Sequence, residues 1–291
     1  MPLTVLTLNV GNPALERARR QRDWLARRVE DVIVLTETGS GPGTHLIAES
    51  YRDAGWSVTY PEHPDKERGV MLLSKLECTI DPIGAAMSYL PARMSGIAVD
   101  TDEGPLRILG AYVPSRDATE AKTTRKRAWI EAFHQAYDTT SDNAPVLFLG
   151  DLNVLEPGHV PPHPVQFAPF ETAFYTELTH RHGLTDVFRA LHPTAVEHSW
   201  ARRTELGYRY DHAHASASPP RPPHQLLLRP RHPFGEPRAH RPFRTRRRAD
   251  ADRDRAADSL RPGRGLRGNA LLNLGARARP PPSCRARGPT G

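Results

Sequence analysis

Short apolar runs that end in polar residues recur along the first two thirds of the chain. Residues 3–8 and 32–35 are rich in β-branched and aliphatic side chains, and polar residues follow each run directly. Runs of this length predict strands, and a continuous apolar stretch is typical of a strand buried on both faces. Between them, residues 14–29 place apolar side chains at helical spacing among Arg and Glu, which predicts an amphipathic helix. Strand, helix and strand in this order are typical of an α/β fold.

The same patterns continue to about residue 217. Helical spacing recurs in three further segments, which are residues 44–54, 120–137 and 171–182. The second of these carries Trp129, Phe133 and Tyr137 on one face. Further strands are predicted over residues 56–60, 69–74, 106–114 and 207–212, and a proline-rich loop over residues 155–170.

The most informative run is residues 145–153. It has the length of a strand, and Gly150 allows a sharp turn where the strand ends. Asp151 and Asn153 follow two positions apart, so the strand period points them the same way. A carboxylate beside a carboxamide suits holding and deprotonating a water next to a phosphate. The same spacing is typical of an Asx turn that closes a strand, and this motif alone leaves both interpretations open.

Polar residues at strand ends form an ordered set along the chain. Asn9, Glu37, Asp151 and Asp211 each follow a predicted strand. A single Asn or Glu at such a position is usually a cap or a solvated end. In α/β sheets, however, functional sites assemble at strand ends, so the complete set predicts one site.

The ordered motifs resemble the endonuclease/exonuclease/phosphatase superfamily, and within it the exonuclease III-like abasic-site endonucleases. The matching segments lie between residues 3 and 216 and are residues 6–10, 35–38, 69–74, 111–114, 150–153, 183–189 and 207–211. The resemblance implies an α/β fold of the four-layer αββα (DNase I-like) type. It also implies hydrolysis of a phosphate ester with Mg²⁺ or Mn²⁺, which Glu37 would ligate.

The resemblance further implies roles for five residues. Asp151 would orient and activate the attacking water, assisted by Asn153. Asn9 would hold the phosphate or a neighbouring site residue, and Tyr112 would donate a hydrogen bond to a phosphate oxygen. Asp211 would orient the catalytic histidine of the family, as a carboxylate fixes an imidazole tautomer in other hydrolases.

Two departures from the family pattern concern aromatic and histidine positions. The Gly-Trp-Arg segment of the family is Gly207-Tyr208-Arg209 here. The terminal Asp-His pair of the family, which supplies a carboxylate and the catalytic histidine, has no counterpart, because the single Asp-His in the sequence is Asp211-His212. That pair matches the earlier orienting motif. Its use in place of the terminal pair would leave the orienting role empty.

The charge of the chain is concentrated at one end. Residues 218–291 contain 18 Arg, no Lys and 5 acidic residues, so the net charge of +7 for the chain leaves −6 for residues 1–217. The high isoelectric point is therefore no evidence for DNA binding. A nuclease still needs local cations against the phosphates. The candidates in the first part of the chain are Arg125, Lys126 and Arg209.

Composition also changes near residue 218. The last 74 residues contain 13 Pro and neither Val nor Ile, so they cannot bury enough apolar surface to offset the entropy of ordering. We expect a domain over residues 1–217, lacking its last strands, and an Arg/Pro-rich disordered tail over residues 218–291. The Arg clusters of this tail leave two interpretations, a solvated segment or a nucleic-acid arm.

A one-base frameshift near codon 218 would explain this change. Codons permitted for residues 239–245, read one base later, give Leu-Thr-Asp-His-Ser-Ala, which contains the missing Asp-His pair. Residues 226–232 likewise permit a strand-like reading, Cys-Ser-Tyr-Val-His-Asp-Thr. The nucleotide sequence of the gene decides between this hypothesis and chance.

The sequence thus predicts a divalent-metal-dependent phosphodiester hydrolase of DNA repair type, impaired by loss of the terminal pair. A phosphoesterase for lipid, sugar or nucleotide phosphates, and an inactive truncated product, are the alternatives. DNA is the expected substrate. No apolar run approaches the roughly 20 residues needed to cross a bilayer, and two cysteines form no disulfide framework. We expect a cytoplasmic monomer that does not bind membranes.

Overall fold

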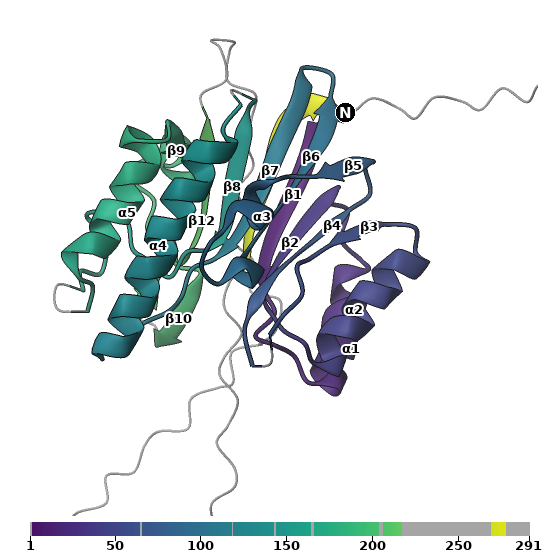
Figure 1. The fold of residues 1–291 in the computed structure, drawn as a ribbon, viewed down its shortest axis with the longest axis horizontal. Helices are drawn as coiled ribbons and strands as arrows, with labels where there is room; N and C mark the ends of the chain where they lie inside the picture. The colour runs from purple at the N-terminus through teal and green to yellow at the C-terminus, as the bar shows by residue number, and fades with distance from the viewer. Residues whose placement is uncertain are drawn as a thin grey trace, which may run out of the picture.

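The computed structural model describes residues 2–64, 66–117, 119–142, 144–163, 166–203, 206–216 and 269–277. Over these ranges, two β-sheets pack face to face, and helices cover the outer face of each sheet (Figure 1). This confirms the four-layer αββα sandwich that the family resemblance implies. None of the helices in these ranges is long and apolar enough to span a membrane.

The first sheet has the strand order β13-β1-β2-β4-β3. Its strands are β1 (Pro2–Asn9), β2 (Val32–Thr38), β3 (Ser57–Thr59), β4 (Gly69–Ser74) and β13 (Asn269–Arg277). Strands β1 and β2 are parallel, and Asn9 at the end of β1 pairs with Thr36 near the end of β2. Parallel pairing therefore brings Asn9 close to Glu37 where the two strands end.

The second sheet has the strand order β5-β6-β7-β8-β12-β9. Its strands are β5 (Cys78–Ile80), β6 (Met94–Thr101), β7 (Gly104–Tyr112), β8 (Val146–Asp151), β9 (Leu184–Asp186) and β12 (Asp211–Ser216). Strand β8 runs parallel to β7 and antiparallel to β12. Asp151, the last residue of β8, consequently lies beside both Tyr112 and Asp211. A separate hairpin joins β10 (Trp200–Arg203) to β11 (Leu206–Tyr208).

Two long helices cover each outer face of the sandwich (Figure 1). Helices α1 (Leu15–Leu25) and α2 (Pro42–Asp53) lie on the first sheet, and α4 (Glu120–Thr140) and α5 (Pro169–His180) lie on the second. The shorter helical segments are α3 (Ile83–Ala86), a 3₁₀ turn at Pro91–Arg93 and α6 (Val187–Leu191).

Strand β8 is buried on both faces, which accounts for its uninterrupted apolar sequence. Val146 and Phe148 pack toward the helices on the second sheet, whereas Leu147 and Leu149 pack toward the first sheet. The sheets approach closely at Gly110 of β7. A Cβ atom built there would lie 2.7 Å from a methyl group of Val34 on β2.

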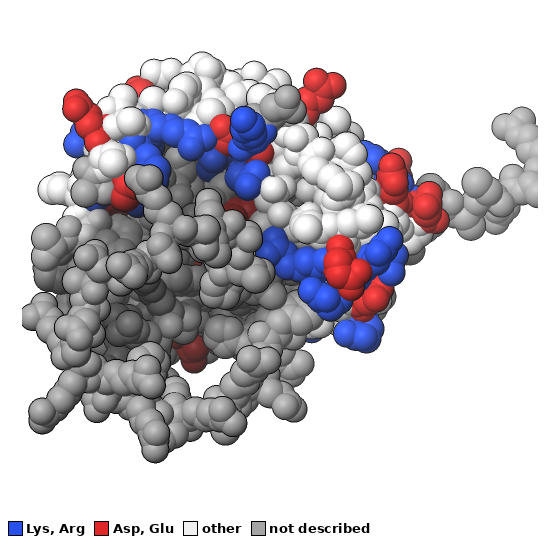
Figure 2. All heavy atoms as spheres, turned by 90° about the horizontal axis from the view of Figure 1, so that it is seen from below, with Lys and Arg blue, Asp and Glu red and all other residues white. Residues whose placement is uncertain are grey.

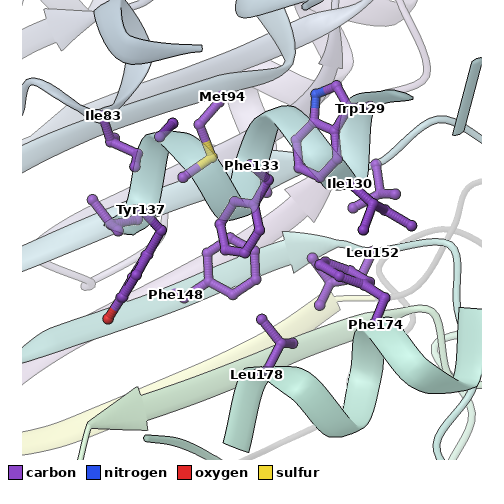
Figure 3. Close-up of a cluster of buried hydrophobic side chains, with 14 of the residues drawn as sticks. Ile83, Met94, Trp129, Ile130, Phe133, Tyr137, Phe148, Leu152, Phe174 and Leu178 are labelled. Carbon is purple, nitrogen blue, oxygen red and sulfur yellow. The ribbon is translucent and has the colours of Figure 1, made fainter. Parts of the chain in front are cut away.

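The predicted aromatic face of α4 forms the centre of the outer core of the second sheet. Phe133 projects from α4 toward Phe148 of β8 and Phe174 of α5, and Trp129 and Tyr137 lie on either side of it (Figure 3). The Phe133 ring centroid lies 5.0 Å from that of Phe148 and 5.7 Å from that of Phe174. These contacts fix α4 and α5 against the strand that carries Asp151.

Two element boundaries differ from the sequence expectation. Helix α1 ends at Leu25, not near residue 29, because the amide of Arg28 bonds back to the carbonyl of Leu25 in a tighter, 3₁₀-type turn. Asp211 does not end a strand over residues 207–212. It begins β12, and it reaches the site because β12 is antiparallel to β8.

Strand β13 comes from the part of the chain for which we expected no packed structure. It pairs antiparallel with β1, from Leu3 opposite Leu274 to Leu8 opposite Asn269. Residues 270–274 are Ala-Leu-Leu-Asn-Leu, a largely apolar stretch within the Arg/Pro-rich C-terminal part. The expectations that the domain lacks its last strands and that residues 218–291 form a tail stay predictions. The rest of the predicted tail, including the segment of residues 239–245, lies outside the described residues.

Candidate active site

Asn9 joins two carboxylates that come from different sheets. Its side-chain nitrogen Nδ2 donates to Oε1 of Glu37 at 3.0 Å and to Oδ2 of Asp151 at 2.7 Å. Its carbonyl oxygen Oδ1 accepts from the amide of Gly11 at 2.9 Å, which fixes the orientation of the amide plane. One carboxamide therefore sets the relative positions of two acidic groups.

A local backbone irregularity aims Glu37 at this point. Alternation along β2 sends Val32 and Val34 toward the second sheet and would send residue 37 to the helix side. The register with β4 shifts between Thr36 and Thr38, and Glu37 has a left-handed φ of 55°. Such a bulge re-aims a side chain, and strained residues of this kind cluster at functional sites. The Glu37 side chain is half-buried at the rim.

Asp151 lies at the end of β8, where the chain turns sharply. Its Oδ1 accepts from the backbone amide of Asn153 at 3.2 Å, which is the Asx turn that the sequence left open. Asn153 has a φ of 50°, and its Nδ2 donates to the carbonyl of Val113 at 2.8 Å. The Asx turn and the carboxylate cluster therefore coexist, with one oxygen of Asp151 holding the turn and the other facing Asn9.

Asp211 and Tyr112 flank Asp151 on the neighbouring strands. Asp211 is directly opposite Asp151 on β12, and the backbone amide of Asp211 donates to Oγ of Ser199 at 3.0 Å. Tyr112 is the β7 partner of Asp151 and belongs to the core between the sheets. All three side chains are at least 95% buried. The structure thus brings every predicted catalytic residue to one end of the sandwich.

The three predicted phosphate-binding cations are held in ion pairs with carboxylates. Lys126 is 0% exposed and bonds to Glu171 and to the carbonyl of Asn153. Arg209 is 4% exposed and bonds to Glu156 and Asp186, and Arg125 pairs with Glu67. Burial in ion pairs argues against direct phosphate contact by Lys126 and Arg209. The sequence shows that these residues are charged, but it does not show that partners satisfy them.

Carboxylates and guanidinium groups set each other's charge states around Arg209. Burial alone would lower the pKa of Arg209, but Asp186 and Glu156 outweigh it and raise the pKa. Burial likewise would raise the pKa of Glu156, but hydrogen bonds from Arg189 and Arg209 lower it to about 2. The network is therefore ionised and internally neutralised, as expected of a structural support.

His212 cannot take the place of the missing terminal histidine in this geometry. Strand alternation turns it to the face opposite Asp211. Its Nε2 lies 3.0 Å from the carbonyl oxygen of Val154, and its Nδ1 lies 3.6 Å from Oδ2 of Asp186. Neighbouring His214 is fully buried, which lowers its pKa to about 3 and keeps it neutral near pH 7. Both imidazoles belong to the helix side of the second sheet.

Three residues near the site were not predicted from the sequence. Arg17 of α1 donates to the carbonyl of Gly11, and Glu37 is close enough to affect its pKa, which burial lowers. Arg93 lies over the ring of Tyr112, 4.6 Å from its centroid. Ser199 holds the backbone of Asp211. Arg17 and Arg93 sit in no recognised motif, so only the fold shows that these cations approach the site.

The end of the sandwich where β1 finishes, the lower end in Figure 1, carries mixed charge. In the view from below, Lys and Arg side chains gather in groups interleaved with Asp and Glu (Figure 2). The visible part of this face is thus no continuous basic surface.

The donor set at this end fits a hard divalent cation. Mg²⁺ is commonly held by one or two carboxylates together with waters and substrate phosphates, not by an all-protein cage. Glu37 offers a half-buried carboxylate at the rim, oriented by Asn9. Among the described residues, no group of three or more His, Cys, Asp and Glu forms a protein-only metal cage. A single carboxylate ligand at Glu37 is compatible with Mg²⁺ or Mn²⁺.

Two face-to-face sheets between helical layers, with carboxylates and carboxamides at one end, define a DNase I-like αββα protein. The sequence model of the Endonuclease/Exonuclease/phosphatase family matches residues 6–185, and the chain belongs to this family. The family comprises hydrolytic nucleases and phosphatases. The match to the family model confirms the resemblance that the ordered motifs indicate. No curated protein sequence matches the chain.

Solved structures with the same fold include enzymes named for action on nucleic acid. An AP endonuclease from Archaeoglobus fulgidus has a TM-score of 0.58 and 21% identity, over 74% of this chain and 86% of that one. A 3′ phosphatase, NExo, from Neisseria, bound to product DNA hairpin, has a TM-score of 0.59 and 21% identity, over 74% and 86%. The 3′-5′ exonuclease NExo from Neisseria meningitidis has a TM-score of 0.58 and 22% identity, over 74% and 87%. At these identities the likeness shows the fold.

Proposed function

We propose that the chain is a divalent-metal-dependent phosphodiester hydrolase that acts on DNA, at abasic sites or at blocked 3′ ends. The observation that carries this proposal is the bridge from Asn9 to both Glu37 and Asp151, which assembles two carboxylates from two sheets. The fold of the AP endonuclease and of NExo supports the choice of DNA as substrate.

The proposed chemistry assigns a proton acceptor and several orienting groups. Asp151 accepts the proton of the attacking water, while its second oxygen keeps the Asx turn closed. Asn9 holds Asp151 at the correct angle, and Asn153 anchors the turn to Val113, directly after β7. Tyr112 donates to a phosphate oxygen, and Asp211 orients the group that protonates or stabilises the leaving oxygen. Donors placed where charge develops lower the barrier most.

Glu37 would hold the metal at the rim of this cluster. When bound, Mg²⁺ or Mn²⁺ supplies positive charge to the phosphate and to the leaving oxygen. Arg17, whose guanidinium lies next to Gly11, would add a cation on the same side. The metal ion and the Arg17 guanidinium would together neutralise the negative charge of the phosphodiester.

Cleavage of duplex DNA that carries an abasic analogue tests the proposal. Wild-type protein and the Asp151→Asn variant are compared with Mg²⁺ and with EDTA. Incision that needs both Mg²⁺ and Asp151 supports the proposal. Wild-type incision that persists in EDTA or in the variant contradicts it.

A second candidate function is hydrolysis of small phosphate esters of lipid, sugar or nucleotide type. The net charge of −6 over residues 1–217 favours it, because a long polyanion is repelled more strongly than a small ester. Activity on small esters without incision of DNA would support this alternative over the first.

We also propose that turnover is impaired, because the only Asp-His pair of the sequence is Asp211-His212 and His212 faces away from Asp151. If a frameshift caused this loss, the gene read one base later near codon 218 encodes an Asp-His pair after a strand. The frame-corrected protein would then incise DNA faster by orders of magnitude. An early stop in the shifted frame contradicts the frameshift. A monomeric state and a cytoplasmic location stay predictions.

A further inference from the structure

A buried lysine reaches the back of the turn that carries Asp151. Lys126 lies on α4, in the helical layer outside the second sheet, and its side chain is 1% exposed. Its Nζ donates to the backbone carbonyl of Asn153 at 2.7 Å. The ammonium group thus reaches this turn through a main-chain carbonyl.

The ion-pair partner of Lys126 has other donors. Oε1 of Glu171 accepts from Lys126 at 2.5 Å, whereas Oε2 accepts from Nε of Arg116 at 2.7 Å and from the amide of Ala168 at 2.8 Å. Two cations therefore meet one buried carboxylate. A buried ammonium is expensive unless it is fully bonded, and the carbonyl of Asn153 supplies a second acceptor.

The electrostatic setting couples this lysine to the candidate site. Burial lowers the pKa of Lys126 from its ordinary value, while Glu171, and more weakly Asp151, oppose the shift. Asp151 is therefore close enough to the ammonium for their charges to interact.

The turn itself needs support from outside. Asn153 has a φ of 50°, a region that a residue other than Gly adopts at a cost of order 1–3 kcal/mol when the surroundings enforce it. Three contacts enforce it here. Oδ1 of Asp151 accepts from the amide of Asn153, the carbonyl of Val113 accepts from its side chain, and Lys126 fixes its carbonyl.

We propose that Lys126 is a positioning residue, which holds the Asp151–Asn153 turn, and thereby the carboxylate of Asp151, in the geometry for water activation. This inference rests on the proposed hydrolytic function. It assigns to Lys126 an action through the backbone, in place of contact with a substrate phosphate. The competing explanation is a purely structural ion pair between α4 and α5.

A pair of variants separates the two explanations. Lys126→Met leaves Glu171 with one cation and is expected to lower stability, because a buried carboxylate loses a partner. Lys126→Met combined with Glu171→Gln also removes the carboxylate charge, while Arg116 keeps its bonds to the carbonyls of Asp117 and Gln166, so part of that stability is expected to return. The carbonyl of Asn153 still lacks its donor in the double variant. Lys122→Met is the control, since Lys122 lies one turn earlier on α4, is exposed, and pairs with exposed Asp117.

Three readouts are compared across these proteins: the melting temperature, kcat and KM for abasic-analogue DNA and for a small phosphodiester, and hydrogen exchange at the amides of residues 152 and 153. For the double variant we expect kcat to fall about 10- to 100-fold with KM changed less than about twofold, because a small misplacement of a reacting group has effects of this size. Exchange at residue 153 should accelerate at least about tenfold, and Lys122→Met should match wild type.

Recovery of both kcat and exchange protection along with melting temperature in the double variant would overturn the inference. Wild-type protein that is silent on every phosphate ester would refute the proposed function instead. In that case hydrogen exchange still decides the role of Lys126, since unchanged protection at residue 153 rejects it. Accelerated exchange confined to this turn supports it with or without activity.

Discussion

The side-chain nitrogen of Asn9 lies 2.7 Å from Oδ2 of Asp151, which joins the first strand of one sheet to the central strand of the other. The two residues are 142 positions apart in the chain. This contact exists only because the sheets pack face to face with their strand ends aligned. The candidate site is therefore a property of the packed sandwich and not of either sheet alone.

Replacing Asp151 by Asn should abolish most hydrolysis while the fold is kept. The change preserves size and removes the proton acceptor, and general base catalysis typically contributes about 10²- to 10⁴-fold. We expect kcat to fall within that range on whichever phosphate ester the wild type cleaves. Asp102→Asn, on an exposed turn, is the control. A variant with more than half of wild-type kcat would exclude Asp151 as the base.

Replacing Glu37 by Gln should weaken binding of Mg²⁺. Glu37 is the carboxylate at the rim of the cluster, and loss of its charge removes the strongest attraction for the ion. A ligand that binds the native state raises its melting temperature, so titration of Mg²⁺ followed by thermal unfolding measures the affinity without any assay of activity. We expect the apparent Kd to rise at least about tenfold. Equal titration curves for variant and wild type would rule out Glu37 as the ligand.

Replacing Gly150 by Ala should destabilise the protein and disturb the site together. Gly150 has a φ of 145°, and a Cβ atom there would lie 2.1 Å from the carbonyl oxygen of Ala111. Strand β8 would have to shift away from β7, at a cost of at least about 1–3 kcal/mol in free energy of unfolding.

The matched control for Gly150 is Gly158→Ala. Gly158 also has a positive φ, of 74°, but nothing lies within 4 Å of its added Cβ atom. Urea unfolding of the two variants compares backbone strain with and without a clash. Equal losses of stability would show that β8 accommodates the methyl group.

The ion pair between Glu156 and its arginines should make stability depend on pH below neutrality. The pKa of Glu156 falls from its ordinary 4.5 to about 2 in the folded protein. A depressed folded-state pKa gives stability that is present above the unfolded value and is lost as pH falls from about 4.5 to about 2. Urea unfolding at several pH values measures this slope.

Glu156→Gln should remove that part of the pH dependence and cost about 3–5 kcal/mol near pH 7, because Arg209 and Arg189 lose a buried partner. Glu49→Gln, at an exposed position of α2, should leave the curve unchanged. The same slope between pH 4.5 and 2 in the Glu156 variant and in wild type would contradict the assignment.

Much of the fold follows from residues whose environment the sequence reveals. The uninterrupted apolar run of residues 146–149 predicts a doubly buried strand, and the spacing of Trp129, Phe133 and Tyr137 predicts the face by which α4 packs. Both predictions are confirmed. They depend on hydrophobic periodicity, which burial enforces strongly.

The finer geometry of the site depends on features that leave no such pattern. The bulge that turns Glu37 toward Asn9 is a backbone irregularity, and no Gly or Pro within it indicates it in the sequence. The start of β12 at Asp211 depends on an antiparallel partner far away in sequence. The burial of Lys126 and Arg209 depends on carboxylates that only folding brings to them. Local sequence indicates which residues are chemically capable, and tertiary packing decides which of them meet.

Gly110 affects the distance between the two sheets, on which the candidate site depends. Its missing side chain lets β7 lie against Val34, and a methyl group there would wedge the two layers apart. The hydrogen bond from Asn9 to Asp151 spans that same gap, so a wider gap would stretch it beyond reach. A substitution at Gly110, which contacts no reacting group, would then separate Glu37 from Asp151. The distance between the two sheets therefore sets the geometry of the candidate active site.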